Sequence, residues 1–336
     1  MNIQEAIAVI IEGQNLTEAQ TTAVMRTIME GETTPAQIGS FLTALRIKGE
    51  TVAEVTGCAR AMREKAAPLK IASTDLVDTC GTGGDGAHTF NISTIAALVA
   101  AGAGLRIAKH GNRSVSSLCG SADLLQELGV RIDLEPAQVA QCIAEVGMGF
   151  LFAPVFHPAM RHAAGPRREI GIRSIFNLLG PLTNPAGAAA QVVGVYQKGL
   201  TKTVADVLGR LGCRHVLAVH GEDGLDEITI TNTTQVSEFA NSRLRTYQLN
   251  PVNLGLPHRS PSEIQGGDAV ENARITHRVL EGEKGARREI VLLNAAATLI
   301  AGDRAKDWID GIELAAHSID SGAALKKLEA LQNFCA

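Results

Sequence analysis

The chain has 336 residues, of which 45% are hydrophobic and 20% charged, with a formal net charge of −4. This length suffices for two domains with their own cores, and the slight acidity argues against nucleic acid as the main partner. No apolar run reaches the roughly 18 residues of a membrane span, and the N-terminus lacks a basic leader, so we expect neither a membrane protein nor a signal peptide. The six cysteines form no CxxC pair, which argues against a metal cage and favours a reducing cytoplasm.

The segment 1–70 predicts four short helices and no strand. Threonine-based capping boxes are expected to begin three of them, at Thr17 with Gln20, Thr34 with Gln37 and Thr51 with Glu54. Glycines at 13, 31 and 49 stand where C-terminal caps are expected. Because no cluster of catalytic residue types occurs here, we expect a helical bundle used for packing or dimerisation.

From residue 76 onward the pattern changes to strand, loop and helix. Residues 77–79 predict the end of a buried strand, and a loop with four glycines follows at 81–86. Glycine leaves backbone N–H groups open to close approach by an anion. An amide and two hydroxyls at 91–94 then open an alanine-rich helix, predicted at 95–103. A helix N-terminus of this kind is a natural phosphate site.

The stretch between positions 85 and 123 contains no acidic residue, while Arg106, Lys109 and Arg113 lie within it. A second strand, predicted at 105–108, ends at Lys109 in the sequence KHGNR. Although the chain as a whole is acidic, this stretch is expected to favour anions.

Two nucleotide motifs fit the glycine loop poorly. The spacing matches the dinucleotide fingerprint G-x-G-x-x-G, but that motif needs an acidic residue about 20 positions on, where Lys109 stands. A Walker loop needs Gly-Lys-Ser or Gly-Lys-Thr, and Gly86 is followed by Ala87 and His88. We therefore expect a phosphate loop of another class.

The rest of the chain predicts further strand and helix units. Strands are expected at 130–134, 149–153, 192–196, 215–219, 235–239 and 244–249, and helices at 136–146, 201–211, 268–280, 287–301, 305–321 and 323–333. This order predicts an α/β fold: a small all-helical N-terminal domain plus a large α/β domain with a central, mostly parallel sheet. The connecting segment 157–185 is dense in basic residues.

Asp226 and Glu227 form an acidic pair that follows a turn and is expected to precede a strand directly. Adjacent carboxylates can bind a hard cation, although a pair at a turn is more often only solvated. A glycine loop, a helix N-terminus, a basic loop and an acidic pair together suit a magnesium-bound substrate with phosphate at two places. Phosphoribosyl pyrophosphate is such a substrate.

The motifs GTGGD (81–85), NIST (91–94), KHGNR (109–113) and GSAD (120–123) stand in the order found in the anthranilate phosphoribosyltransferase family of tryptophan biosynthesis. FAPVFHPAMRH and RREIGIRSIFNLLGPLTNP extend the resemblance, which covers the chain from end to end. It implies transfer of the phosphoribosyl group to the amine of anthranilate, with Mg²⁺ and without an acid–base residue of the protein. It also implies a cytoplasmic homodimer that joins through the helical domain.

The resemblance further implies domain boundaries and site residues. The helical domain would comprise 1–70 with a contribution from about 170–188, and the α/β domain 71–169 and 189–336. The residues implied to hold phosphoribosyl pyrophosphate are Gly81, Gly84, Asp85, Thr89, Asn91, Ile92, Ser93, Thr94, Lys109, His110, Gly111, Asn112, Arg113, Ser114, Val115, Ser116, Ser117 and Ser121. Those implied for anthranilate are Gly81, Asn112 and Arg167, with His110 and His157 along its route. Those implied for the metal are Ser93, Asp226 and Glu227.

Two rival functions remain open on the residues alone. A pyrimidine nucleoside phosphorylase shares the fold and places phosphate similarly, but the intact KHGNR motif, Arg167 and the acidic pair favour the transferase. Relatives of the fold that bind nucleic acid lose the GTGGD loop and gain surface basicity, and this chain does neither.

Overall fold

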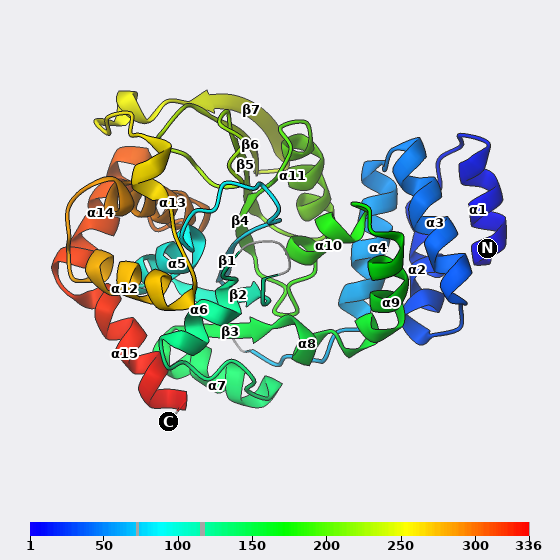
Figure 1. The fold of residues 1–336 in the computed structure, drawn as a ribbon, viewed down its shortest axis with the longest axis horizontal. Helices are drawn as coiled ribbons and strands as arrows, with labels where there is room; N and C mark the ends of the chain where they lie inside the picture. The colour runs from blue at the N-terminus through cyan, green and yellow to red at the C-terminus, as the bar shows by residue number, and fades with distance from the viewer. Residues whose placement is uncertain (72–73, 115–117, 336) are drawn as a thin grey trace.

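The computed structural model describes residues 1–71, 74–114 and 118–335. Its N-terminal helices form a lobe at one end of the molecule, and a larger α/β lobe forms the rest (Figure 1). The helical lobe begins with α1 (Ile3–Ile11), α2 (Glu18–Glu30), α3 (Pro35–Lys48) and α4 (Val52–Glu64). The predicted four-helix start is therefore confirmed.

All three predicted capping boxes are present. Thr17, Thr34 and Thr51 each accept the backbone N–H three residues on, and the side chain of that third residue accepts the threonine N–H. Gly31 ends α2 with a φ of 76°, a left-handed conformation that glycine adopts without strain. Local signals thus set the helix boundaries in this lobe.

Residues from much later in the chain complete the helical lobe. Helix α9 (Arg161–Ile170) packs against α2 and α3, and α10 (Phe176–Leu182) packs against α4. Leu179 of α10 is fully buried in the same hydrophobic cluster as Phe41 and Leu45 of α3. The bundle is therefore built from two separate stretches of chain.

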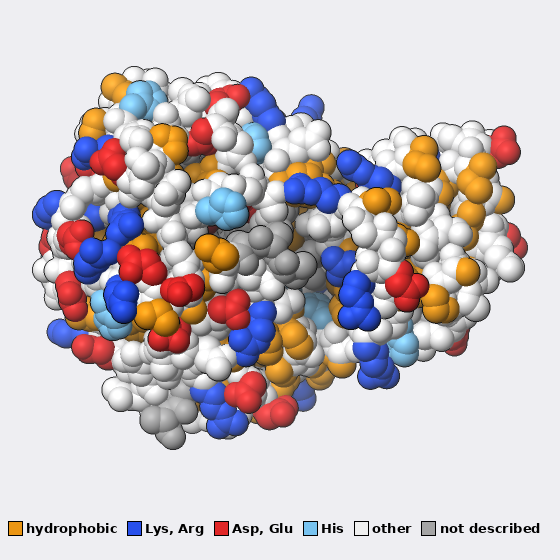
Figure 2. Space-filling view, viewed as in Figure 1, with side chains coloured by type: hydrophobic (Ala, Val, Ile, Leu, Met, Phe, Trp, Pro, Cys, Tyr) orange, Lys and Arg blue, Asp and Glu red, His pale blue; other side chains and the backbone are white. Residues whose placement is uncertain are grey.

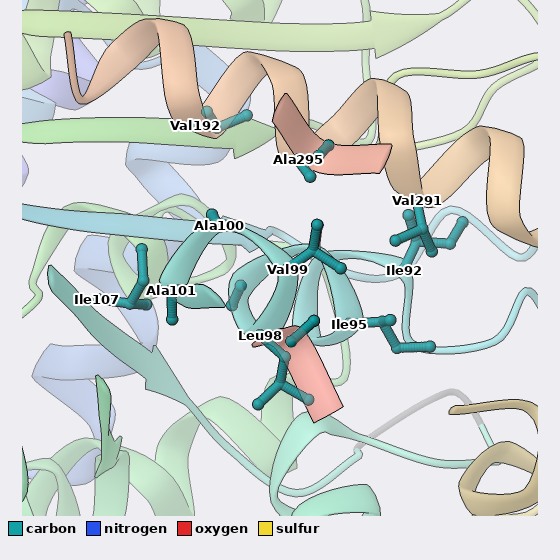
Figure 3. Close-up of a cluster of buried hydrophobic side chains, with 14 of the residues drawn as sticks. Ile92, Ile95, Leu98, Val99, Ala100, Ala101, Ile107, Val192, Val291 and Ala295 are labelled. Atoms are coloured by element: carbon teal, nitrogen blue, oxygen red, sulfur yellow. The ribbon is translucent and has the colours of Figure 1, made fainter. Parts of the chain in front are cut away.

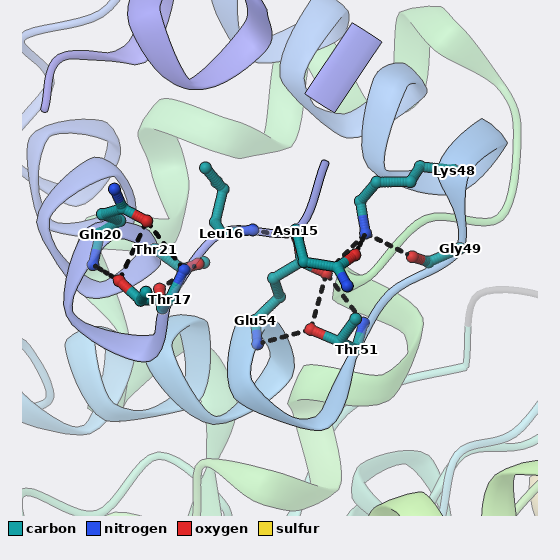
Figure 4. Close-up of polar contacts among 9 residues, drawn as sticks. All are labelled: Asn15, Leu16, Thr17, Gln20, Thr21, Lys48, Gly49, Thr51 and Glu54. Atoms are coloured by element: carbon teal, nitrogen blue, oxygen red, sulfur yellow. Dashed lines mark hydrogen bonds and ion pairs between the residues drawn. The ribbon is translucent and has the colours of Figure 1, made fainter. Parts of the chain in front are cut away.

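A buried ion pair joins α3 to α4 (Figure 4). Lys48 Nζ lies 2.9 Å from Glu54 Oε2, and the two side chains are 7% and 0% exposed. Glu54 also accepts the backbone N–H of Leu16 at 3.0 Å and that of Thr51 at 2.8 Å. The carboxylate thus ties the segment before α2 to the start of α4.

We expect Lys48→Met to lower the free energy of unfolding by about 2 kcal/mol, because it leaves the buried Glu54 carboxylate without its cation. Urea denaturation at pH 7 measures this loss. Lys65→Met is the matched control, since Lys65 pairs with Glu30 at a site where both side chains are 34% exposed and partly screened by water. Equal losses in the two variants would contradict the role assigned to the buried pair.

A seven-stranded sheet forms the centre of the larger lobe. Its order is β3-β2-β1-β4-β5-β6-β7; the pairs from β3 to β5 are parallel, and the pairs β5–β6 and β6–β7 are antiparallel. The strands are β1 (Leu76–Gly81), β2 (Arg106–Gly111), β3 (Met148–Phe152), β4 (Ala190–Gly194), β5 (His215–Gly221), β6 (Thr234–Ala240) and β7 (Arg243–Leu249). The predicted mostly parallel sheet is confirmed.

Different helices cover the two faces of this sheet. On one face, α5 (Ile92–Gly102) packs against α13 (Ala286–Ala301), and Figure 3 shows apolar side chains of both helices meeting near Val192 of β4. On the other face, the neighbouring Val193 belongs to the cluster that contains α11 (Leu200–Arg210) and the helical lobe. Because successive strand residues point to opposite faces, β4 contributes to both cores.

The remaining helices surround the sheet. They are α6 (Ser121–Glu127), α7 (Pro136–Val146), α8 (Ala153–Phe156), α12 (Ala269–Leu280), α14 (Trp308–Asp320) and α15 (Ala323–Cys335), with short 3₁₀ turns η1 (Pro158–Met160), η2 (Pro251–Leu254) and η3 (Pro261–Ile264). Helices α7, α12, α14 and α15 lie near predicted positions, whereas no helix was predicted at 121–127 or 153–156. In the part of the chain that the structure describes, no helix has the length and apolar character needed to cross a bilayer.

The strand predicted at 130–134 is wrong. Val130, Ile132 and Leu134 are buried and alternate with exposed Arg131 and Asp133, which is the pattern of a half-buried strand. The segment nevertheless forms no ladder and connects α6 to α7 as an extended loop. Alternation of apolar and polar residues shows that one side of the segment is buried. A β-strand also requires backbone hydrogen bonds to a neighbouring strand.

Candidate active site

The candidate site lies where three neighbouring parallel strands end. β1 ends at Gly81, β2 at Gly111 and β4 at Gly194, and the sheet order places β1 between the other two. The chain adds β2 on one side of β1 and returns later to add β4 on the other side. Ligands of α/β proteins bind at such a switch point, beyond the carboxyl ends of the strands. Figure 2 shows the surface hollowed between the two lobes, with Lys and Arg side chains nearby.

The glycine loop leaves β1 in a conformation that only glycine adopts easily. Gly83, Gly84 and Gly86 have φ values of 70°, 77° and 73°. The backbone N–H of Thr82 donates to the Gly194 carbonyl at 2.9 Å, which fastens the start of the loop to β4. This bond fixes the base of the loop, so the glycines that follow lie at the carboxyl end of β1.

The acidic pair contacts this loop directly. Asp226 Oδ2 accepts the N–H of Gly83 at 2.6 Å, and Glu227 Oε1 accepts the N–H of Ser93 at 3.1 Å. A side chain at Gly81 or Gly194 would overlap atoms of Asp226. Two strand-end glycines therefore make room for the aspartate. The pair lies in the loop between β5 and β6 and precedes no strand directly, because β6 begins only at Thr234.

Both carboxyls of the pair have a raised pKa because they are removed from water. Burial raises the pKa of Asp226 well above its usual range, and the charges of Asp85 and Glu227 add to this effect. Burial also raises the pKa of Glu227 to about 7, against the opposing effect of Lys109. A nearby cation would favour the ionised form of both groups.

The residues present fit a hard divalent cation. Asp226 and Glu227 supply carboxylate oxygens, and Asp85 lies beside them, where its Oδ2 accepts the Asp226 N–H at 3.4 Å. Over residues 1–71, 74–114 and 118–335, no group of three or more His, Cys, Asp and Glu side chains is arranged to hold a metal. Magnesium is usually held by one or two carboxylates together with substrate phosphates and water. An open pair of carboxylates suits that mode of binding.

The start of α5 is held by neighbouring side chains. Asn91 precedes the helix but does not cap it: Nδ2 donates to the Cys119 carbonyl at 3.1 Å, and Oδ1 accepts from Asn272 Nδ2 at 2.9 Å. Glu227 accepts the Ser93 N–H in the first turn. A carboxylate of the protein therefore contacts the helix N-terminus at which the sequence predicts phosphate binding.

Lys109 is buried in a polar network beside β1. The residue is 1% exposed, and Nζ donates to the Thr79 carbonyl at 2.6 Å. Asp78, fully buried in β1, accepts from Asn184 Nδ2 at 2.8 Å and from the His110 N–H at 3.3 Å. Burial raises the pKa of Asp78 to about 6, opposed by the charge of Lys109. The ammonium group thus stabilises buried carboxyls.

The other two cations of the acid-free stretch, Arg113 and Arg106, lie apart from Lys109. Arg113 Nη1 lies 2.8 Å from Asp123 Oδ1, and Nη2 donates to Gln126 at 2.6 Å. Arg106 begins β2 and so lies at the edge of the sheet opposite the strand ends. Asp123 also accepts the Ser114 N–H at 3.0 Å, because the chain folds the end of this stretch back onto its middle.

Other predicted substrate residues flank these loops. Ser121 Oγ donates to the Asn112 carbonyl at 3.4 Å, and Thr89 forms an isolated antiparallel bridge with Gln265. The predicted contacts at Val115, Ser116 and Ser117 lie outside the described residues.

Two arginines come from the basic segment that links the lobes. The Arg167 guanidinium lies 4.8 Å from the Phe176 ring centroid and forms no ion pair with any residue that the structure describes, and burial lowers its pKa. Arg173 donates to the Gly84 carbonyl and lies 4.4 Å from the Tyr196 ring centroid. A half-buried guanidinium without a carboxylate partner suits a carboxylate ligand.

His110 and His157 form a buried pair of rings. Their centroids are 5.1 Å apart in an edge-to-face arrangement, and neither Nε2 atom has a hydrogen-bond partner within the described chain. Burial lowers the pKa of His110 to about 3 and that of His157 to about 4. Both imidazoles are therefore neutral at pH 7.

We expect the destabilisation caused by His157→Gln to shrink by about 1.4 kcal/mol per pH unit as the pH falls from 6.5 toward 4. The lowered pKa of His157 contributes stability that is fully present above its unfolded value of 6.5 and is lost toward the folded value of about 4. The raised pKa values of Asp78 and Glu227 act with the opposite sign and cancel in the difference between variant and parent. Urea denaturation over this range, with exposed His258→Gln as control, measures the slope; a constant difference would contradict the neutral assignment.

Sequence reasoning missed three residues of this region. Asp78 could have been found as a charged residue inside an apolar strand, and Arg173 was singled out only as part of a basic segment. Asn184 donates to both Asp78 and the Ala108 carbonyl, at 2.8 and 2.7 Å, but its Asn-Pro context predicts only a turn.

Two family models match the chain. The glycosyl transferase family α/β domain matches residues 73–325, and the helical bundle domain of the same family matches residues 4–66. The helical model covers the N-terminal helices, and the α/β model covers the sheet together with α9 and α10, which pack on the helical lobe. The class is therefore a glycosyl transferase with a helical bundle attached to an α/β domain.

Individual relatives narrow this class. The anthranilate phosphoribosyltransferase of Moorella thermoacetica is 57% identical over 98% of this chain and 97% of its own, and that of Symbiobacterium thermophilum is 58% identical over 97% and 95%. The crystal structure of the Thermus thermophilus enzyme has a TM-score of 0.94 at 44% identity, covering 98% of this chain and 99% of that one. The Saccharomyces cerevisiae enzyme in complex with phosphoribosyl pyrophosphate and magnesium has a TM-score of 0.90 at 29% identity, over 99% and 97%. The chain belongs to the anthranilate phosphoribosyltransferase family.

Proposed function

We propose that this chain transfers the phosphoribosyl group of phosphoribosyl pyrophosphate to the amine of anthranilate and releases pyrophosphate, the second step of tryptophan synthesis from chorismate. The observation that carries the proposal is the contact of the acidic pair with both anion-binding segments, through Gly83 and Ser93. Two N–H-rich segments beside a cation-binding pair suit a sugar with phosphate at both ends. The acceptor follows from the name that the relatives share.

Magnesium is the proposed cofactor, as in the yeast complex. Asp226 and Glu227 would hold it, with Ser93 beside them. When bound, magnesium supplies positive charge to the departing pyrophosphate. Because burial raises the pKa of both carboxyls, a bound cation would favour their ionised form.

The chain itself contributes positioning and charge stabilisation. Glycine-loop N–H groups other than that of Gly83, which Asp226 accepts, bind phosphate oxygens, and Arg167 binds the anthranilate carboxylate so that the amine faces the sugar C1 carbon. The first-turn N–H groups of α5 have partners within the chain, so this helix contributes its dipole. Cys80, one residue before the loop, is no nucleophile, because burial raises the pKa of its thiol well above the usual range. We therefore expect no covalent intermediate on Cys80.

The proposed assembly is a cytoplasmic homodimer that joins through the helical domain. The proposed domains are 1–70 with about 170–188, and 71–169 with 189–336. The packing of α10 against α4 supports the added helical segment. The buried thiols of Cys58, Cys80 and Cys213 suit a reducing compartment.

The decisive assay follows the loss of anthranilate fluorescence with phosphoribosyl pyrophosphate and magnesium, together with pyrophosphate release. We expect one pyrophosphate for each anthranilate consumed. Thymidine cleavage with phosphate, or a mobility shift of single-stranded DNA at physiological salt, would overturn the proposal if either occurred without anthranilate consumption.

We expect Arg167→Ala to raise the apparent KM for anthranilate by about tenfold or more, because a charge-assisted hydrogen bond contributes about 1.5–3 kcal/mol. Steady-state kinetics with each substrate varied in turn measures the effect. Exposed Arg168→Ala on the same helix is the control. If the apparent KM for phosphoribosyl pyrophosphate rose instead, Arg167 would not be the residue that binds anthranilate.

A further inference from the structure

A cavity of about 210 Å³ opens at the N-terminus of α13, where the connection from α12 ends. Figure 1 shows α12 on the side of the α/β lobe remote from the helical lobe. Gly285 precedes α13, and no side chain caps the helix. The first N–H groups of an uncapped helix attract anions, although this alone does not make a site.

Arg288 supplies an independent observation. The residue lines the cavity, is 4% exposed, and pairs through Nη2 with Asp320 Oδ2 at 2.8 Å. Its Nη1 is buried and has no hydrogen-bond partner in the described chain. Nη1 lies 3.9 Å from the position that a Cβ of Gly282 would occupy, so the missing side chain leaves space beside it. A buried guanidinium nitrogen without an acceptor indicates a ligand that supplies one.

The neighbouring cations are also incompletely neutralised. Lys284 Nζ lies 3.4 Å from Asp320, so this lysine and Arg288 share one carboxylate. Arg287 donates through Nη2 to the Gln265 carbonyl at 3.2 Å, its Nε is buried without a partner, and it forms no ion pair with the residues described. The cavity therefore has spare positive charge.

The two carboxylates that line the cavity have other partners. Glu263 accepts the Ser260 N–H at 2.9 Å, and Glu283 lies 3.7 Å from Arg278. Neither is placed to satisfy Arg287 or Arg288.

We propose that this cavity binds a tetrahedral oxyanion of the phosphate class between the α13 N-terminus and the guanidinium groups of Arg287 and Arg288. A guanidinium offers paired N–H donors that match phosphate oxygens, and helix N–H groups add further donors. The cavity and the loop of the acidic pair both contact α13, but they share no residue. Two turns beyond the cavity, Asn294 donates to the Ile228 carbonyl at 2.8 Å and accepts the Ile228 N–H at 3.0 Å. Changes at the cavity entrance therefore leave the proposed catalytic groups in place.

Crystals soaked in tungstate test the position of the site, because the anomalous signal distinguishes this cavity from the glycine loop. We expect a peak within hydrogen-bonding distance of Arg288 Nη1. Calorimetric titration with inorganic phosphate at constant ionic strength tests binding in solution. The double variant Lys284→Gln, Arg287→Gln is expected to weaken phosphate binding at this cavity by about tenfold. Phosphate binding at the glycine loop is expected to stay unchanged.

Two further variants keep the test decisive. Arg288→Lys retains a cation for Asp320 but lacks Nη1, and it is expected to weaken the same class of sites. Lys306→Gln removes an exposed charge elsewhere and is expected to bind like the parent. Absence of the peak overturns the proposal. A peak without any difference between parent and double variant in solution would mean an adventitious ion only, and an equal loss in Lys306→Gln would mean a general charge effect; both overturn it.

Discussion

Replacing Asp226 by asparagine together with Glu227 by glutamine is expected to lower kcat/KM by about 10²–10³-fold, as does the loss of other pre-organised electrostatic groups. The two carboxylates are the proposed magnesium ligands, and amides carry no charge with which to hold a hard cation. The loss should be largest at limiting magnesium. Anthranilate consumption measured over a magnesium series tests this, and an unchanged rate at limiting magnesium would contradict the assignment.

The same double variant is expected to keep its fold. Burial already favours the neutral form of both carboxyls, and an amide is neutral and nearly isosteric. The asparagine carbonyl can still accept the Gly83 N–H that Asp226 accepts at 2.6 Å. Tm is therefore expected to stay close to that of the parent, which separates lost chemistry from lost structure. Glu222→Gln is the control, since it removes an exposed charge from the same loop and should retain the magnesium dependence.

Gly194→Ala is expected to lower the free energy of unfolding by about 4 kcal/mol and to remove most of the activity. A methyl group there would overlap the backbone carbonyl of Asp226. Gly194 pairs in register with Gly81 of β1, so the strand cannot yield without disturbing the base of the glycine loop. The loop that carries Asp226 must move instead, which takes the carboxylate away from Gly83.

The matched control for that substitution is Gly199→Ala. Gly199 has helical φ and ψ values of −62° and −16°, and nothing lies within 4 Å of the position of an added Cβ. This change is expected to alter stability by less than about 0.5 kcal/mol. Urea denaturation and the anthranilate assay on both variants test the pair. Parent-like stability and activity of Gly194→Ala would show that the close approach of the two backbones is not needed.

The N-terminal helices and the mostly parallel sheet could be predicted from the sequence, because the sequence patterns that indicate them are local. A threonine followed three residues later by glutamine or glutamate begins a helix through reciprocal side-chain to backbone hydrogen bonds. All three capping boxes of this kind are present in the structure. Alternating strand and helix patterns likewise predict a parallel sheet. The same logic failed at 130–134, where alternation was present but no partner strand was within reach.

The charges of the site were harder to predict. The acid-free stretch was expected to favour anions, yet Arg113 is paired with Asp123, Lys109 is buried beside Asp78, and Arg106 begins its strand at the far edge. Residues close in sequence can be separated by the length of a strand, and residues far apart can neutralise them. Net charge along a segment therefore does not report the charge that a ligand meets.

Short-range chemistry in the chain was thus enough to define the four N-terminal helices and the glycine loop, because each depends on residues within a few positions of one another. The helices at 121–127, 161–170 and 176–182 were not predicted. The motifs, through their resemblance to a known family, were enough to name the reaction. Only the folded chain decided that Asp226 and Glu227 hold the N–H groups of Gly83 and Ser93, more than 130 residues earlier. The pKa values of the pair follow from that placement, since burial and neighbouring charge are properties of three-dimensional packing that no local pattern encodes.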